Sequence, residues 1–372
     1  MVFFIFVSIT LIIYFAFVGF ALVGWKGKST LYKEKDGLRN TQSVNAADGV
    51  SIIIPFRNEA HVLNDFLSQT AFRPQTDCLF EIILVNDHSS DNWMDLISDL
   101  PIQYRLLNND GDGKKSAILT GVKASKYQTI LTTDVDCTIP INWVKKMLNA
   151  KRNANASMVF GGVRLLHNGS LFGQFQSIDY SAMATVGAGF AHMNYPFICS
   201  GANLMFDKDD YFSVIGKIRM DYLSGDDVFL LHAFVERKFI VSFVHDTEAI
   251  VTSKVQSSFR SLINQRVRWG SKAIAYTNST AVLVSIIVFV TNATLVLAFG
   301  LLSNNIVSLV VFSSIYLLKA VVDILFFRAT DRFWQLGCSY MSLIITSLIY
   351  PMWILITALL GFTWRGSWKG RK

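Results

Sequence analysis

The sequence predicts an α/β domain with membrane-spanning helices at both ends of the chain. Of the 372 residues, 52% are hydrophobic and 16% are charged, whereas charged residues make up about 25% of an ordinary soluble domain. The excess of apolar residues lies in the first and last parts of the chain. The middle part alternates short apolar runs with amphipathic helices, which is typical of helices packed on a sheet.

The first element is an uncharged segment, residues 1–24. At about 1.5 Å per residue, a helix of this length crosses a hydrocarbon core of roughly 30 Å. The segment lacks the basic start and cleavage site of a signal peptide, so we expect a retained anchor. Basic residues follow it, and positive charge beside spans tends to stay in the cytoplasm. We therefore expect a cytoplasmic middle region, and interpret the net charge of +7 as attraction to anionic lipid rather than to nucleic acid.

The middle region, residues 45–245, contains the expected strands. Continuous β-branched runs favour parallel strands that are covered on both faces. The runs are Val50–Ile54, Ile82–Val85 and the start of "YQTILTTDVD", with helices expected at Glu59–Thr70 and Lys114–Ser125. Each run ends in a polar cluster: Arg57-Asn58-Glu59, Asn86-Asp87 and Asp134-Val135-Asp136. Ligands bind outside the carboxyl ends of parallel strands, so these clusters predict a binding site.

Two carboxylates one residue apart, Asp134 and Asp136, indicate a divalent cation. Bare carboxylates would repel each other, and hard cations such as Mg²⁺ bind carboxylate oxygens together with substrate phosphates. Side chains alternate along a strand, so we expect Asp136 to bind the metal directly and Asp134 to reach the ribose or a metal-bound water. A solvated acidic turn is the alternative.

The stretch "GDGKKSAILTG" places Gly111 and Gly113 before a helix that starts with Lys114 and Lys115. Helix N-terminal amides attract anions, and lysine adds a charge for phosphate. The spacing excludes a Walker loop. The alternative is an ordinary loop with exposed lysines.

In "YLSGDDVFLLHAF", two carboxylates directly precede an apolar helix. Asp226 is expected at the helix N-cap, where it would accept backbone hydrogen bonds. Asp227 is not needed for capping and is the candidate general base.

Residues 246–279 are expected to form amphipathic helices at the membrane interface. They contain Gln265, Arg268 and Trp269, of which the first two share a helix face. Arginine can clamp phosphate through two parallel hydrogen bonds. An interfacial anchor with no role in binding is the alternative.

The second apolar block, residues 280–362, divides into three segments, followed by a basic tail at 363–372. Three full spans would place this tail outside, although its charge favours the cytoplasm, so one segment is expected to be re-entrant or interfacial. Lys319 and Asp323 lie four residues apart in the middle segment and are expected to pair away from lipid. This pair is the only support for a transporter.

The order of these residues resembles membrane-bound family 2 glycosyltransferases. The resemblance covers Val50 to about Lys272 and rests on Asp87, Asp134-Val135-Asp136, Asp227 and Gln265-x-x-Arg268-Trp269. It implies the GT-A fold, an α/β domain that binds a nucleotide-diphosphate sugar, with a UDP-sugar expected.

The resemblance also implies a role for each matching residue. The nucleotide would be held by Phe56, Asn58, Glu59, Asp87, Lys114 and Asp134. Mg²⁺ or Mn²⁺ would be carried by Asp136 and Asp134, and the base would be Asp227, supported by Asp226 where the family usually has Glu. The diphosphate would be covered by Gln265, Arg268 and Trp269, and Ser200–Asn203 would lie beside the acceptor.

The acceptor is expected to be a lipid, because few spans leave little room for a polymer channel. With this arrangement of apolar segments, the chain is similar to ceramide glucosyltransferases and to bacterial glycosyltransferases of lipids or carotenoids. The similarity implies an inverting enzyme that resides in the bacterial inner membrane. Residues 181–193 are small and apolar and are a candidate lipid access path, or else a packed helix. A processive polysaccharide synthase and a non-enzymatic scaffold are the alternatives.

Overall fold

The computed structural model describes residues 2–36, 49–69, 79–94, 103–219, 221–222, 224–302 and 306–363. The chain divides into two compact units. The sheet unit comprises Gly27–Arg164 and Ala191–Lys254, and the helical unit comprises Met1–Lys26, Leu165–Phe190 and Val255–Ser367. Residues 165–190 thus group with the apolar helices, although the sequence placed them in the α/β domain. The basic tail lies outside the described residues beyond Thr363.

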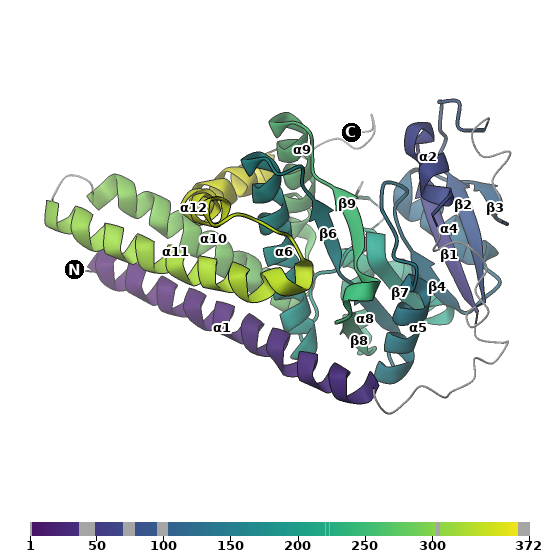
Figure 1. The fold of residues 1–372 in the computed structure, drawn as a ribbon, viewed down its shortest axis with the longest axis horizontal. Helices are drawn as coiled ribbons and strands as arrows, with labels where there is room; N and C mark the ends of the chain where they lie inside the picture. The colour runs from purple at the N-terminus through teal and green to yellow at the C-terminus, as the bar shows by residue number, and fades with distance from the viewer. Residues whose placement is uncertain are drawn as a thin grey trace. The chain divides into compact units, whose positions relative to one another are not determined.

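The sheet unit is built on a seven-stranded mixed sheet with the order β3-β2-β1-β4-β7-β5-β8 (Figure 1). Its strands are β1 (Val50–Phe56), β2 (Phe80–Asn86), β3 (Arg105–Asn108), β4 (Thr129–Thr132), β5 (Met158–Gly161), β7 (Leu204–Asp207) and β8 (Val241–Val244). The first four strands are mutually parallel, and β7 runs antiparallel to both β4 and β5. The three expected parallel strands are therefore confirmed, and their carboxyl ends meet at one edge. A separate two-stranded sheet pairs β6 (Val163–Leu166) with β9 (Val251–Lys254).

Helices pack on the strands of this unit. They are α2 (Ala60–Leu67), α4 (Gly113–Ala124), α5 (Trp143–Ala154), α7 (Lys208–Val214) and α8 (Val228–Glu236). Every residue of β1 is buried, as expected for a continuous apolar run covered on both faces. Helix α4 approaches β1 closely at Gly121, where an added Cβ would lie 2.5 Å from Cγ2 of Ile53. A larger residue at Gly121 would push α4, and with it Lys114, away from the sheet.

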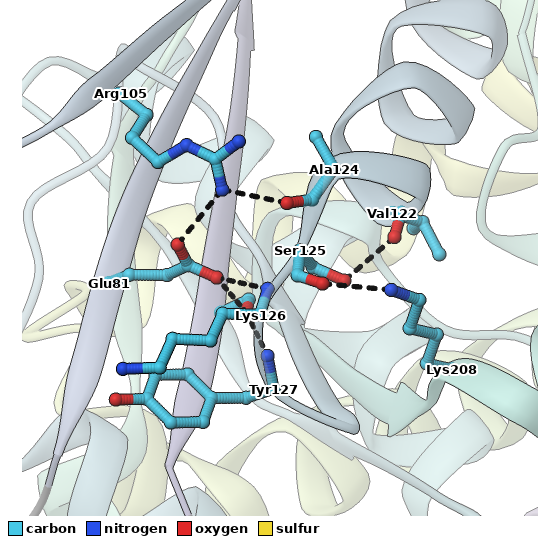
Figure 2. A network of polar contacts seen from close by, with 9 residues as sticks. Glu81, Arg105, Val122, Ala124, Ser125, Lys126, Tyr127 and Lys208 are labelled. Atoms are coloured by element: carbon cyan, nitrogen blue, oxygen red, sulfur yellow. Dashed lines mark hydrogen bonds and ion pairs between the residues drawn. The ribbon is translucent and has the colours of Figure 1, made fainter.

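A polar network holds the amino ends of the central strands together (Figure 2). The Glu81 carboxylate accepts hydrogen bonds from Ser51 Oγ at 2.6 Å and from the backbone amide of Lys126 at 2.5 Å. Arg105 pairs with Glu81 at 3.3 Å and donates to the carbonyl of Ala124 at 2.7 Å. These contacts lie at the edge opposite the polar clusters, so they stabilise the sheet and leave the other edge for a site.

In the part of the chain that the structure describes, the helical unit contains six α-helices, of which four are long and apolar enough to span a membrane. The six are α1 (Val2–Asp36), α6 (Leu171–His192), α9 (Phe259–Gly270), α10 (Ser279–Leu302), α11 (Ile306–Trp334) and α12 (Tyr340–Thr363). The unit includes α1 only as far as Lys26 and α6 only as far as Phe190. Among the described residues, four helices meet the length and hydropathy of a span: α1, α10, α11 and α12.

Helix α6 packs closely against α1 near its end. A Cβ added at Gly189 would lie 2.2 Å from the carbonyl oxygen of Ala21, so the two helices touch backbone to backbone there. Ser181, Thr185 and Ala188 are all buried. The packed-helix alternative for residues 181–193 is therefore the one the structure supports.

Lys319 and Asp323 form an ion pair inside the helical unit, as expected. Their side chains are 0% and 2% exposed, and Nζ lies 2.5 Å from Oδ2. Tyr14 of α1 donates to the other carboxylate oxygen at 2.8 Å. Because both charges have partners within the helices, the pair joins α1 to α11 and gives no support to a transporter.

Candidate active site

Lys114 lies at the centre of an ionic cluster at the carboxyl edge of the sheet. Helix α4 begins at Gly113, whose φ of +86° suits glycine. The next residue, Lys114, places Nζ 2.6 Å from Asp134 Oδ1 and 3.1 Å from Asp226 Oδ2. Burial lowers the pKa of Lys114, but the charges of Asp134 and Asp226 raise it more, so its pKa lies well above the ordinary value. A permanent cation therefore stands between two carboxylates that the sequence assigned to one site.

Lys115 has a different role from Lys114. Its side chain is buried and its Nζ donates to the carbonyls of Arg219 and, at 2.6 Å, of Tyr222. Successive side chains on a helix point about 100° apart. Lys115 thus holds the segment that precedes Asp226, and of the two lysines only Lys114 faces the carboxylates.

Asp227, and not Asp226, is the N-cap of α8. Its Oδ1 accepts from the amide of Val228 at 2.7 Å, and its Oδ2 accepts from the amide of Gly201 at 3.2 Å. The expectation that Asp226 caps the helix and that Asp227 is not needed for capping was therefore wrong, since Asp226 turns toward Lys114 instead. Two backbone amides fix the orientation of the Asp227 carboxylate, which a general base requires.

The Ser200–Asn203 segment forms a wall of the cluster. Gly201 leaves no room for a side chain, because a Cβ there would lie 2.6 Å from Asp226 Oδ2 and 3.4 Å from Lys114 Nζ. The Gly201 carbonyl accepts from Thr132 Oγ1 at 2.8 Å. Asn203 is 0% exposed and donates to the carbonyls of Gly162 and Ala249, each at 2.8 Å. Asn203 thus supports the wall from behind.

Asp134 and Asp136 lie in a loop that follows β4, which we call the metal loop (Asp134–Asp136) after the cation that the sequence predicts there. Strand β4 ends at Thr132, so the alternation of side chains along a strand does not apply to these two carboxylates. Asp134 is half-buried beside Lys114, and Asp136 is exposed. Carboxylate oxygens are what Mg²⁺ or Mn²⁺ prefers. Asp136 is therefore accessible to a cation, whereas Asp134 is already paired with Lys114. This arrangement suits a cation that binds together with a diphosphate.

Gln69 fixes the residues that directly follow the metal loop, and nothing in the sequence indicated this role. Its Nε2 donates to the carbonyl of Cys137 at 3.0 Å, and its Oε1 accepts from the amide of Ile139 at 2.6 Å. The amide of Thr138 also donates to the carbonyl of Thr252 at 2.6 Å. No local pattern could have identified Gln69, because its partners lie about seventy residues away in the chain.

The residues expected at the nucleotide meet at the ends of β1 and β2. Asp87 is 1% exposed, and its Oδ1 accepts from Asn109 at 2.7 Å and from the amide of Gly113 at 3.0 Å. Asn58, with a φ of 51°, accepts from the amide of Ser90 at 2.8 Å. The loops after β1, β2 and β3 are thereby tied together around Asp87.

Three further side chains complete this region. Glu59 Oε2 accepts from the amide of Arg57 at 3.3 Å, and Arg57 Nη1 donates to the carbonyl of Asp87 at 2.8 Å. Phe56 is only 2% exposed and packs edge-on against Trp93. Phe56 therefore supports the floor of this region and presents no open face for stacking on a nucleobase.

A second group of potential metal ligands occurs at the same edge. The side chains of Asp87, His88 and Asp112 place ligand atoms within 4.8 Å of one another. This group differs from the metal loop predicted from the sequence. Asp87 Oδ1 already accepts two hydrogen bonds, which leaves it a weaker ligand than an exposed carboxylate.

Gln265, Arg268 and Trp269 lie on α9 in the helical unit. Helix α9 begins at a Ser258 capping box. Arg266, between the motif residues, pairs with Asp179 at 2.8 Å and lies 4.6 Å from the ring centroid of Trp269. The Gln265 side-chain oxygen is buried and has no hydrogen-bond donor among the described residues. The helix is thus anchored through Arg266, while Gln265 retains an acceptor that a ligand can use.

Part of the sheet unit is similar to a known protein family. Residues 51–211 match the family model described as glycosyl transferase family 2. Poly-beta-1,6-N-acetyl-D-glucosamine synthase of Staphylococcus epidermidis is 28% identical over 140 residues, which is 37% of this chain and 34% of that protein. The same synthase of Staphylococcus aureus is 26% identical over 152 residues, covering 38% of this chain and 35% of that protein. The chain thus spans about a third of the length of the curated relatives it matches.

A solved structure matches almost the whole chain. The mannosyltransferase PcManGT from Pyrobaculum calidifontis, in complex with GDP-Man and Mn²⁺, is similar with a TM-score of 0.57 and 14% identity. The match covers 97% of this chain and 99% of that one. At this identity the likeness concerns the fold. The chain therefore has the fold of this mannosyltransferase, and residues 51–211 of its sheet unit are similar to family 2 glycosyltransferases.

Proposed function

We propose that the chain transfers a sugar from a nucleotide-diphosphate donor to a hydroxyl group of a membrane lipid. The observation that carries this proposal is the cluster of Lys114, Asp134, Asp226 and Asp227 at the carboxyl edge of the parallel strands. It combines a fixed cation for a leaving diphosphate with an oriented carboxylate for an attacking hydroxyl. The four helices that could span a membrane support an acceptor that resides there.

The chemistry follows from the charges of these residues. The acceptor oxygen forms a bond to the anomeric carbon as the bond from that carbon to the diphosphate breaks, and the nucleoside diphosphate leaves with the electron pair. Asp227 takes the hydroxyl proton, a contribution of about 10²–10⁴-fold for a general base. The Lys114 ammonium stabilises the charge that develops on the leaving group. Attack opposite the leaving group inverts the anomeric centre.

The metal loop would hold the divalent cation. Mg²⁺ or Mn²⁺, when bound by Asp134 and Asp136, would neutralise charge on the donor diphosphate. The basic residues that flank the apolar segments support a domain at the cytoplasmic face of a bacterial inner membrane.

A polymerising synthase is the second candidate function. The relatives named above are polysaccharide synthases, which favours it, and the match to them is confined to about a third of their length. The two functions differ in their products, since transfer to a lipid ends after one sugar and a synthase adds many.

One experiment tests both candidates. The purified full chain is incubated with UDP-sugars and GDP-sugars, Mg²⁺ or Mn²⁺, and total bacterial lipid, and the products are read by mass spectrometry. The lipid proposal predicts a single sugar increment on a lipid, with a UDP-sugar as donor. A ladder of increments would establish the synthase, and no turnover together with no metal-dependent nucleotide binding would contradict both.

A further inference from the structure

We infer that α12 does not cross the membrane, but lies in a single leaflet with its exposed apolar side chains among lipid acyl chains. Its length and hydropathy equal those of a span. Its position among the other helices of the helical unit differs from theirs. In Figure 1, α1, α10 and α11 run along the long axis of the picture, whereas α12 is seen nearly end-on.

Contacts among α1, α10 and α11 define the two sides of the bundle. The first half of α1 packs with the second half of α10 and the start of α11, in a cluster of Val7, Leu11, Leu295, Ala298 and Phe312. At the opposite side, Trp25 of α1 stacks on Trp334, the last residue of α11, with ring centroids 5.9 Å apart. The side marked by Trp25 and Trp334, where α1 leaves the bundle and α10 enters it, is called the near side below.

Both ends of α12 contact residues in the half of the bundle that is nearer to Trp25 and Trp334 than to the cluster of Val7, Leu11 and Phe312. At its start, the amide of Ser339 donates to Gln174 at 2.7 Å, and the Tyr340 ring lies 4.6 Å from the guanidinium of Arg328 in the last part of α11. At its end, a Cβ added at Gly361 would lie 3.3 Å from the backbone of Gly270, where α9 ends shortly before α10 begins.

The length of α12 makes these contacts incompatible with a crossing. Its 24 residues extend about 36 Å at 1.5 Å per residue. A crossing helix that starts at the near side would end beside the cluster of Val7, Leu11 and Phe312, at the far side of a hydrocarbon core of roughly 30 Å. Its actual end meets Gly270 instead, so the helix must run mainly in the plane of the membrane.

The middle of α12 packs on α6 and α9 as well as on α11, where Tyr316 donates to the carbonyl of Leu348 and Lys319 lies 5.2 Å from the ring centroid of Tyr350. Trp353 lies in a buried cluster with Phe175 of α6 and Leu262 of α9. Its indole nitrogen donates to Asp179 at 3.4 Å, the carboxylate that also pairs with Arg266. The in-plane helix is therefore joined to α9, which carries Gln265, Arg268 and Trp269.

The other face of α12 is apolar and exposed. Nine large apolar side chains on it are exposed: Tyr340, Met341, Ile344, Leu348, Ile349, Met352, Ile356, Leu359 and Phe362. A surface of this kind is stable only where it is removed from water. Because the same unit contains three helices that can cross a membrane, acyl chains of the near leaflet are the occupant that the structure favours.

Single-cysteine labelling tests the inference and does not depend on enzyme activity. The four cysteines of the full chain are replaced by serine. A single cysteine is then introduced as Thr277→Cys at the near side, Asn304→Cys between α10 and α11, or Ser367→Cys in the tail. Sealed membrane vesicles are treated with a membrane-impermeant maleimide before and after permeabilisation.

The inference predicts that Ser367→Cys and Thr277→Cys share one labelling pattern and that Asn304→Cys shows the opposite one. Labelling of Ser367→Cys together with Asn304→Cys would overturn it, because α12 would then cross. An otherwise native chain with a protease site appended to the tail gives the same answer if the cysteine-free protein does not fold. Fluorophores at Met341→Cys and Leu359→Cys should be quenched equally by spin-labelled lipid placed in the near leaflet, whereas a crossing helix would leave one unquenched.

Discussion

Replacing Lys114 with methionine should change turnover and metal binding in opposite directions. Lys114 Nζ lies 2.6 Å from Asp134 and 3.1 Å from Asp226. Without donor, the lysine competes with a divalent cation for the Asp134 carboxylate. With donor bound, the proposed mechanism makes the same ammonium group a stabiliser of the leaving diphosphate. Lys114→Met removes both effects and keeps the length and apolar stem of the side chain.

The expected magnitudes follow from these two roles. Loss of one preorganised group at a developing charge reduces turnover by about 10²–10³-fold. The Asp134 side chain is 35% exposed, so solvent screens its pairing with Lys114 to roughly 1 kcal/mol. Release of that pairing should tighten cation binding by about fivefold, since 1.4 kcal/mol corresponds to a factor of ten.

The measurement needs one control on the same helix. Transfer is assayed with saturating donor, and Mn²⁺ binding without donor is measured by electron paramagnetic resonance of the unbound ion. Lys123→Met removes an exposed lysine in the last turn of α4 and should change neither quantity. If Lys114→Met transferred sugar within tenfold of the native rate, or bound Mn²⁺ more weakly, the assignment of Lys114 to both roles would be refuted.

Three other substitutions test separate parts of the structure. Asp227→Asn should retain donor binding and reduce transfer by at least about 10²-fold, because the amide cannot accept the proton; a variant that still transfers would show that another group is the base. Gln69→Glu removes the amide donor that holds the residues after the metal loop, and should raise the metal concentration for half-maximal activity about tenfold, whereas Asn64→Asp, an exposed change of the same charge on α2, should have no effect. Burial, together with the charge of His192, lowers the pKa of His245 to about 4. The unfolded chain binds a proton at this histidine below about pH 6.5 and the folded chain does not, so stability should fall by up to about 3 kcal/mol from pH 6.5 to pH 4. His245→Gln should flatten that part of the profile in denaturant titrations of the full chain, and an unchanged slope would show that His245 is not responsible.

The strands and the polar clusters were predictable because both depend on local sequence. The runs that became β1 and β2 are apolar and β-branched over their whole length, which only a strand covered on both faces accommodates. Once those strands are parallel, their carboxyl ends must lie at one edge, and the carboxylates that follow β2 and β4 are gathered there. The GT-A assignment needed no contact that the sequence does not imply.

The roles of neighbouring residues depended on packing that local sequence does not encode. Lys114 and Lys115 are identical in type and adjacent in the chain, yet one meets two carboxylates and the other meets two backbone carbonyls. A rotation of about 100° per residue in a helix separates them, and only the position of α4 on the sheet decides which of them faces the cluster. Asp226 and Asp227 differ for a similar reason, since the turn before α8 directs only the second to the amide of Gly201.

By itself, the sequence determined the α/β domain, the residues gathered at the edge of its sheet, and which segments are apolar enough for a membrane. The tertiary structure decided that Lys114 pairs with carboxylates whereas Lys115 binds backbone carbonyls. It also decided that Gln69 fixes the residues that follow the metal loop, and it set the positions of the two ends of α12. The physical reason is that hydrophobic pattern and chain connectivity act over a few residues. The direction of a side chain and the path of a long apolar helix are set by partners that lie far away along the chain.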